Sequence, residues 1–122
     1  MNTVLWILQI VLAAAFLGAG LMKIARPKPA LVAAGQGYVE DFPDASIKAI
    51  GAAEVLAAAG LILPAVTGVA TILVPLAALG LFVTMVGAVI VHVRREEQFV
   101  PPLVLGVLAL VVAIGRFGPY PL

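Results

Sequence analysis

The 122-residue sequence contains no cysteine, a single histidine, and only 11% charged residues. Without cysteine the chain cannot form a disulfide, a thiolate metal site, an iron–sulfur cluster or a redox-active CxxC motif. A single histidine cannot supply both ligands of a bis-histidine haem. The sequence also lacks a dinucleotide-binding fingerprint. We therefore expect no metal and no covalently attached cofactor, and we expect that this chain is not an enzyme on its own.

Net charge is also small, at +1, and this gives no reason to expect nucleic acid or an acidic protein as a partner. Apolar residues instead make up 64% of the chain. A soluble domain is roughly half apolar and about a quarter charged. The composition therefore predicts that lipid, rather than water, surrounds most of this protein.

Four long apolar runs are separated by short polar breaks. Each approaches the roughly 17–25 residues that cross a hydrocarbon core, and a single segment in lipid satisfies its own backbone amides only as a helix. No Lys or Arg precedes the first run, which is longer than the h-region of a signal peptide, so we expect a retained helix. We predict one all-α domain over residues 1–122, a transmembrane four-helix antiparallel bundle with helices at about 4–23, 46–64, 68–92 and 99–115.

Two further expectations concern particular segments. Pro75 falls inside the third predicted helix and is expected to kink it. The first loop spans residues 25–46, and its middle, residues 30–38, is compatible with a short helix at the membrane interface.

Basic residues near the helix ends predict the orientation of the bundle. One side carries six of them, whereas the other side carries only Arg116. The richer side should face the cytoplasm, so both termini are predicted to be non-cytoplasmic. The six residues are Lys23, Arg26, Lys28, Lys48, Arg94 and Arg95.

Three ionisable residues are predicted to meet at one end of the bundle. Lys23 ends the first helix, Glu54 lies seven residues into the second, and His92 ends the third. Because the helices alternate in direction, all three fall toward the cytoplasmic side, with Glu54 about 10 Å below the start of its helix. Ionisable groups in membrane helices are costly and usually face protein or water. We predict a Lys23–Glu54–His92 cluster that binds a ligand or closes the bundle.

Each of these residues lies on a helical face of small side chains. Small residues at steps of three or four let membrane helices approach closely. We expect Gly20, Gly51, Thr84 and Ala88 to line the cluster. The same small residues make a homo-oligomer a second expectation. The three faces are Gln9, Ala13, Phe16, Gly20 and Lys23; Gly51, Glu54, Ala58 and Leu61; and Gly80, Thr84, Ala88 and His92.

A structural explanation stays open beside the functional one. Lys23 alone is often a residue whose ammonium reaches the headgroups, and a histidine at a helix end is often interfacial. Glu54 is well inside an apolar span, where it forms either a structural ion pair or a functional site. The remaining residues expected at headgroup level are Lys48, Arg116, Trp6 and Tyr120.

Four short motifs lie at or near Lys23, Glu54 and His92: GLMK at residues 20–23, GAAE at 51–54, GLILP at 60–64 and MVGAVIVH at 85–92, the last followed by basic residues. In these motifs the sequence resembles the DoxX-like family of small four-helix membrane proteins. The resemblance implies a multi-pass protein of the plasma (inner) membrane, with Lys23, Glu54 and His92 in the polar positions of the family. Members are tied to thiosulfate–quinone oxidoreduction and to membrane complexes that handle oxidative stress. Distant animal relatives act as membrane chaperones or cargo receptors.

Three functions are compatible with these patterns. The first is a membrane accessory or anchor subunit of a quinone-linked redox system, with a quinone or lipid held at the cluster and a redox protein as partner. The second is a non-enzymatic assembly, chaperone or binding protein that recognises a membrane client and membrane lipid. The third, a transporter, is the least favoured because no inverted repeat is evident.

Overall fold

The computed structural model of the protein describes residues 1–33 and 37–122. Within them the chain forms four long helices, one short helix and a single 3-10 turn, and no strand. The four long helices are all long and apolar enough to cross a membrane. The elements are α1 (Asn2–Ala25), α2 (Lys28–Ala33), η1 (Gly37–Asp41), α3 (Asp44–Thr67), α4 (Leu73–Arg94) and α5 (Val100–Phe117).

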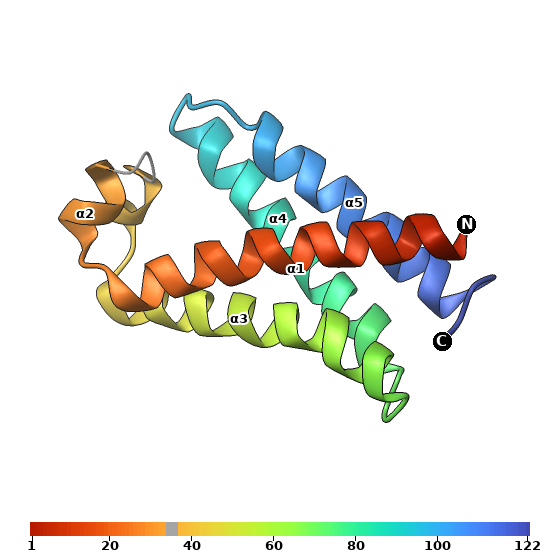
Figure 1. Cartoon of the computed structure of the whole chain (residues 1–122). Helices are drawn as coiled ribbons and strands as arrows, with labels where there is room; N and C mark the ends of the chain where they lie inside the picture. Colours follow the sequence, from red (N-terminus) through yellow and green to blue (C-terminus); the bar gives the residue numbers. More distant parts are fainter. Residues whose placement is uncertain (34–36) are drawn as a thin grey trace.

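The four long helices pack as an antiparallel bundle, which confirms the predicted all-α fold. Helix α1 packs mainly against α3, and α4 packs mainly against α5, while α3 with α4 and α1 with α5 join the two pairs (Figure 1). Both chain termini lie at one end, which we call the terminal end. The α1–α3 loop and the α4–α5 turn lie at the other end, which we call the loop end.

The outer surface of the bundle is apolar. Leu56, Leu63 and Val83 are 72%, 60% and 61% exposed, and many other large apolar side chains also point outward. Inside, a core of side chains such as Leu12, Phe16, Leu61 and Leu81 holds the helices together. An apolar interior and an apolar exterior together are stable only where lipid takes the place of water.

The turn between α3 and α4 is longer than the sequence indicated. Gly68 adopts a left-handed backbone conformation, with φ of 72°, and its N–H donates to the carbonyl of Pro64 at 2.9 Å. This αL cap ends α3, and α4 begins only at Leu73 rather than near residue 68. Pro75 therefore lies in the first turn of α4, where its missing N–H costs no helical hydrogen bond, and not inside the helix as expected.

The first loop packs onto the loop end through a small core of its own. Leu31 of α2, Val39 of η1 and Ile47 of α3 are buried against one another. The expected short helix at residues 30–38 corresponds in part to α2, and residues 34–36 of that range lie outside the described residues. The apolar contacts hold α2 and η1 beside the site described next.

Candidate functional site

Helices α1 and α3 touch backbone to backbone at Gly20 and Gly51. A Cβ placed on Gly20 would lie 2.6 Å from the carbonyl oxygen of Gly51, and one on Gly51 would lie 2.8 Å from the carbonyl oxygen of Gly20. Real side chains do not tolerate such distances, so only glycine permits this crossing. The short separation of the axes brings together the residues one turn further along each helix.

Those residues are Lys23 and Glu54. The Nζ of Lys23 donates a hydrogen bond to Oε1 of Glu54 at 2.7 Å, and the two side chains are only 7% and 3% exposed. Side chains lean toward the N-terminus of their own helix, so in this antiparallel pair the ammonium points deeper and the carboxylate points back toward it. The pair compensates two charges that would each be costly to bury alone.

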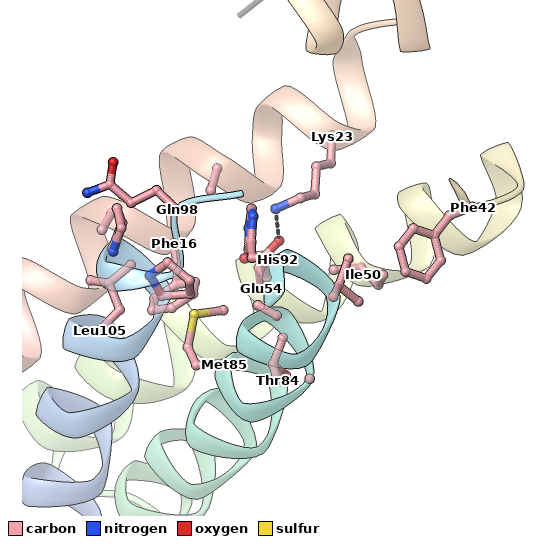
Figure 2. A pocket seen from close by; sticks show the side chains of 17 residues that line it. Phe16, Lys23, Phe42, Ile50, Glu54, Thr84, Met85, His92, Gln98 and Leu105 are labelled. Atoms are coloured by element: carbon pink, nitrogen blue, oxygen red, sulfur yellow. Dashed lines mark hydrogen bonds and ion pairs between the residues drawn. The ribbon is translucent and has the colours of Figure 1, made fainter. Parts of the chain in front are cut away.

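The ion pair forms part of the wall of a cavity of about 620 Å³ at the loop end. The cavity lies between the α1–α3 pair and the α4–α5 pair, and most of its lining is apolar (Figure 2). Its polar lining consists of Lys23, Glu54, Thr84, His92 and Gln98. The apolar lining residues are Ala15, Phe16, Ala19, Phe42, Ile50, Met85, Gly87, Ala88, Val91, Pro101, Pro102 and Leu105.

His92 shares this cavity with Lys23 and Glu54, as Figure 2 shows. Its side chain is 19% exposed, and its Nδ1 lies 3.2 Å from Oε1 of Glu97 in the α4–α5 turn. The structure thus brings all three residues of the expected cluster to one cavity. It adds Glu97 as a neighbour of the imidazole, which the sequence did not indicate.

The four expected lining residues divide into two groups. Thr84 and Ala88 line the cavity, and the hydroxyl of Thr84 donates to the carbonyl of Gly80 at 2.8 Å. Gly20 and Gly51 instead form the helix contact that positions the ion pair, and they are not among the described residues that line the cavity.

The small-residue face expected on α4 is not its packing face. Gly80 is exposed, and a Cβ there would meet nothing within 4 Å. The buried side chains of α4 lie on a neighbouring face and include the larger Leu81 and Met85. On α1 and α3, by contrast, the expected faces are buried, with Ala13 partly exposed.

A charged clasp joins the α1–α3 loop to the α4–α5 turn beside the cavity. The Nη1 of Arg95 donates to Oδ2 of Asp41 at 2.8 Å, and its Nε lies 3.2 Å from Oε1 of Glu97. Asp41 makes the largest contribution and Glu97 a smaller one to raising the pKa of Arg95 above its ordinary value. Phe42 and Gln98, which lie next to the clasp in sequence, both line the cavity. The clasp therefore connects the two segments that cover the cavity at the loop end.

A second polar network lies at the terminal end. Arg116 is 3% exposed, so the expectation that it reaches the headgroups is wrong. Its Nε donates to Oε1 of Gln9 at 2.8 Å, and its Nη1 donates to Oδ1 of Asn2 at 2.6 Å and to the carbonyl of Tyr120 at 3.0 Å. Gln9 in turn donates to the carbonyl of Leu61 at 2.8 Å. These hydrogen bonds link α1, α3 and α5. The acceptors around Arg116 replace water that its buried guanidinium would otherwise bind.

The two polar sites differ in what they offer a ligand. The terminal-end network is packed within the protein, whereas the Lys23–Glu54 pair and His92 border open space. Among the described residues, no three His, Asp or Glu side chains gather closely enough to hold a metal ion. The cavity at the loop end offers instead an ammonium, an imidazole, an amide and a hydroxyl above an apolar floor, a combination suited to a small amphipathic molecule.

The sequence model of the DoxX-like family matches residues 7–114 of the chain. This range contains all of α3 and α4, most of α1 and α5, and every polar residue that lines the cavity. No curated protein and no solved structure matched the chain.

Proposed function

We propose that this chain, which belongs to the DoxX-like family, is a membrane accessory or anchor subunit of a quinone-linked redox system. In this role it holds a quinone, or a lipid with a similar polar head, in the cavity at the loop end. The observation that supports the proposal is the position of the buried Lys23–Glu54 pair and of His92 on the wall of one largely apolar cavity.

The size and lining of the cavity suit a quinone head. A volume of about 620 Å³ lies within the range of small-molecule sites, roughly 300–1,000 Å³. A quinone ring needs apolar contact on its faces and hydrogen-bond donors at its carbonyl oxygens. Phe16 and Met85 supply apolar surface, and Lys23, His92 and Gln98 carry N–H groups.

The cavity also reaches the outer surface of the bundle. Ala15 of α1, Gly87 of α4 and Pro101 of α5 line it and are exposed. Because these residues lie within membrane-spanning helices, a lipid-soluble ligand can enter sideways from the bilayer and need not cross water. This route favours a quinone or lipid over a polar solute.

Electron transfer in this proposal belongs to a partner protein. The chain has no cysteine and one histidine, so it cannot ligate an iron–sulfur cluster or a bis-histidine haem by itself. Its own groups would bind the quinone and hold or move protons, with Glu54 and His92 as the proposed proton carriers at the cavity. The chain is thus proposed as the membrane-embedded, quinone-binding part of a larger complex.

The distribution of basic residues supports a location in the plasma membrane with the loop end in the cytoplasm. Six basic residues lie at or near that end, and Arg116 alone lies near the other. Both termini would then be non-cytoplasmic.

One observation favours a second function. The ammonium of Lys23 and the carboxylate of Glu54 already satisfy each other at 2.7 Å, as they would in a clasp that only holds α1 to α3. A chain built in this way can serve as a non-enzymatic assembly or chaperone factor that binds a membrane client through its exposed helix faces.

A cavity-filling variant separates the two functions. Ala88→Leu places a larger side chain in the cavity without removing the ion pair, and Ala52→Leu adds the same volume on the exposed face of α3 as a matched control. We expect wild type and Ala52→Leu, purified in mild detergent, to carry extractable quinone that mass spectrometry identifies, and Ala88→Leu to carry several-fold less at an unchanged melting temperature. Wild-type protein that holds no quinone but co-purifies with a stoichiometric membrane protein would support the second function instead.

A further inference from the structure

A second cavity lies at the loop end, where α1 ends and α3 begins. It has a volume of about 420 Å³ and is lined by residues from α1, from the start of α2 and from the start of α3. Figure 1 shows these segments together at the end of the molecule opposite the chain termini. The residues that matter for its chemistry are Arg26, Lys28, Asp44 and Lys48.

The charge of this cavity is unbalanced. Arg26, Lys28 and Lys48 line it, and Asp44 is the only carboxylate among its described lining residues. In the part of the chain that the structure describes, no ion pair involves any of these three cations. Lys23 also contributes to the lining, but its ammonium is held by Glu54. The positive charge of these three cations therefore exceeds the single negative charge of Asp44.

One of these lysines is held in place by the backbone. The Nζ of Lys48 donates to the carbonyl of Ile24 at 2.9 Å, in the last turn of α1. That carbonyl belongs to a helix end whose acceptors lack helical partners, and a cation there is favourable. An ammonium has three donors, so this bond leaves further donors available to a ligand.

The surroundings of the cavity match the headgroup depth of a bilayer. It lies at the ends of two membrane-spanning helices, and Ile24 beside it is 39% exposed. Leu21 and Leu17 continue from Ile24 along one face of α1 and are 49% and 44% exposed. A molecule with an anionic head in the cavity can therefore place an apolar chain along this row toward the bilayer centre.

We propose that this cavity binds the phosphate headgroup of an anionic phospholipid, with an acyl chain along Leu17, Leu21 and Ile24. Arg26, Lys28 and Lys48 would donate charge-assisted hydrogen bonds to the phosphate oxygens. Basic pockets at the ends of membrane helices are suited to such headgroups. A zwitterionic lipid is disfavoured because its cationic group would meet the same three cations. The inference is independent of quinone binding, since it concerns a different cavity.

Ligand-dependent thermal stability of the purified full chain tests the proposal. The probes are short-chain phosphatidylglycerol, short-chain phosphatidylcholine and inorganic phosphate. Each is titrated into protein held in an uncharged detergent. The variant is Lys28→Gln with Lys48→Gln, and Arg94→Gln is a matched control because Arg94 is an exposed cation outside the cavity. A ligand that binds only the folded protein raises its melting temperature.

We expect phosphatidylglycerol to raise the melting temperature of wild type and Arg94→Gln, and phosphatidylcholine to have little effect. In the double variant, the phosphatidylglycerol concentration that gives half of the maximal rise in melting temperature should increase about tenfold or more. The reason is that each cation removed weakens attraction to an anionic lipid. Equal stabilisation by phosphatidylcholine, or an unchanged response of the double variant, would overturn the proposal. A full effect of inorganic phosphate at the same concentration would also overturn it, by identifying a free-phosphate site.

Should the double variant fail to fold, the single variants Lys28→Gln and Lys48→Gln provide the same comparison. Each is expected to weaken the response to phosphatidylglycerol, and high salt should weaken that of wild type. A response insensitive to both changes would count against a phosphate site.

Discussion

Gly20 of α1 and Gly51 of α3 lie so close that a Cβ on the first would be 2.6 Å from the carbonyl oxygen of the second. This contact sets the distance between the two helices that carry Lys23 and Glu54. The ion pair at the cavity wall therefore depends on two residues without side chains.

Gly20→Ala should push α1 and α3 apart, because the new methyl group meets backbone that cannot move aside by rotation. Overpacking of this kind costs about 1–3 kcal/mol, so we expect a clearly lower melting temperature in detergent. Gly18→Ala is the control, since a Cβ at Gly18 meets nothing within 4 Å. An equal loss of stability in both variants would show that the close contact is not the cause.

The Lys23–Glu54 pair can be examined by a double-mutant cycle with Lys23→Met and Glu54→Gln. Each single change leaves one buried charge without its partner, and such a change costs about 3–5 kcal/mol. The double variant leaves neither charge and should be less destabilised than the sum of the two singles. Equilibrium unfolding in detergent measures the three differences. Strict additivity would mean that the two side chains do not interact.

The terminal-end network predicts that Arg116 stabilises the fold. Arg116→Met removes the donor to Gln9 and to Asn2. The oxygen of Gln9 is then buried without that partner, at about 1–3 kcal/mol, whereas Asn2 is exposed. We expect a lower melting temperature and little change in ligand binding at the opposite end. Arg94→Gln, at an exposed arginine, is expected to change neither. Loss of ligand with unchanged stability in Arg116→Met would contradict this assignment.

The clasp between Asp41 and Arg95 predicts local rather than global effects. Because both side chains are partly exposed, Asp41→Asn should barely alter the melting temperature, yet it should speed amide hydrogen exchange in η1. Glu40→Gln, an exposed neighbour, serves as the control. High salt should speed exchange of wild type toward the rate of the variant. Identical exchange in both variants would show that the ion pair does not hold the loop.

The raised pKa of Arg95 predicts how the clasp responds to a change in pH. The carboxylates of Asp41 and Glu97 raise this pKa above that of an unfolded chain, where it is already high. A raised pKa means that the contribution to stability is complete below the unfolded value and is lost only as the pH rises through the folded one. We therefore expect no loss of the clasp when the pH is raised moderately, as hydrogen exchange corrected for its intrinsic pH dependence would show.

The sequence was sufficient for the fold because the bilayer restricts the choice. Four apolar runs of spanning length have to be helices, and short breaks have to make neighbours antiparallel. The same reasoning identified the buried faces of α1 and α3, on which glycine and alanine recur at helical steps. It also assigned Lys23 and Glu54 to the same end, since alternate helices run in opposite directions.

Other features were set by contacts between segments distant in the sequence. The start of α4 depended on the backbone conformation of Gly68. The packing face of α4 depended on larger residues, such as Met85, that fill the space between helices. Arg116 was expected at headgroup level because nothing local shows that Gln9 and Asn2 come within hydrogen-bond distance of it. Only packing reveals such partners.

Periodicity and span length alone therefore determined the number, direction and approximate depth of the helices, because those properties follow from each segment's own interaction with lipid. The tertiary structure decided the rotation of each helix about its axis and the spacing between axes. Those two quantities determine which polar residues meet: Lys23 with Glu54, the pair with His92 at the loop-end cavity, and Arg116 with Gln9. They arise from side chains fitting between helices, and no single helix contains that information.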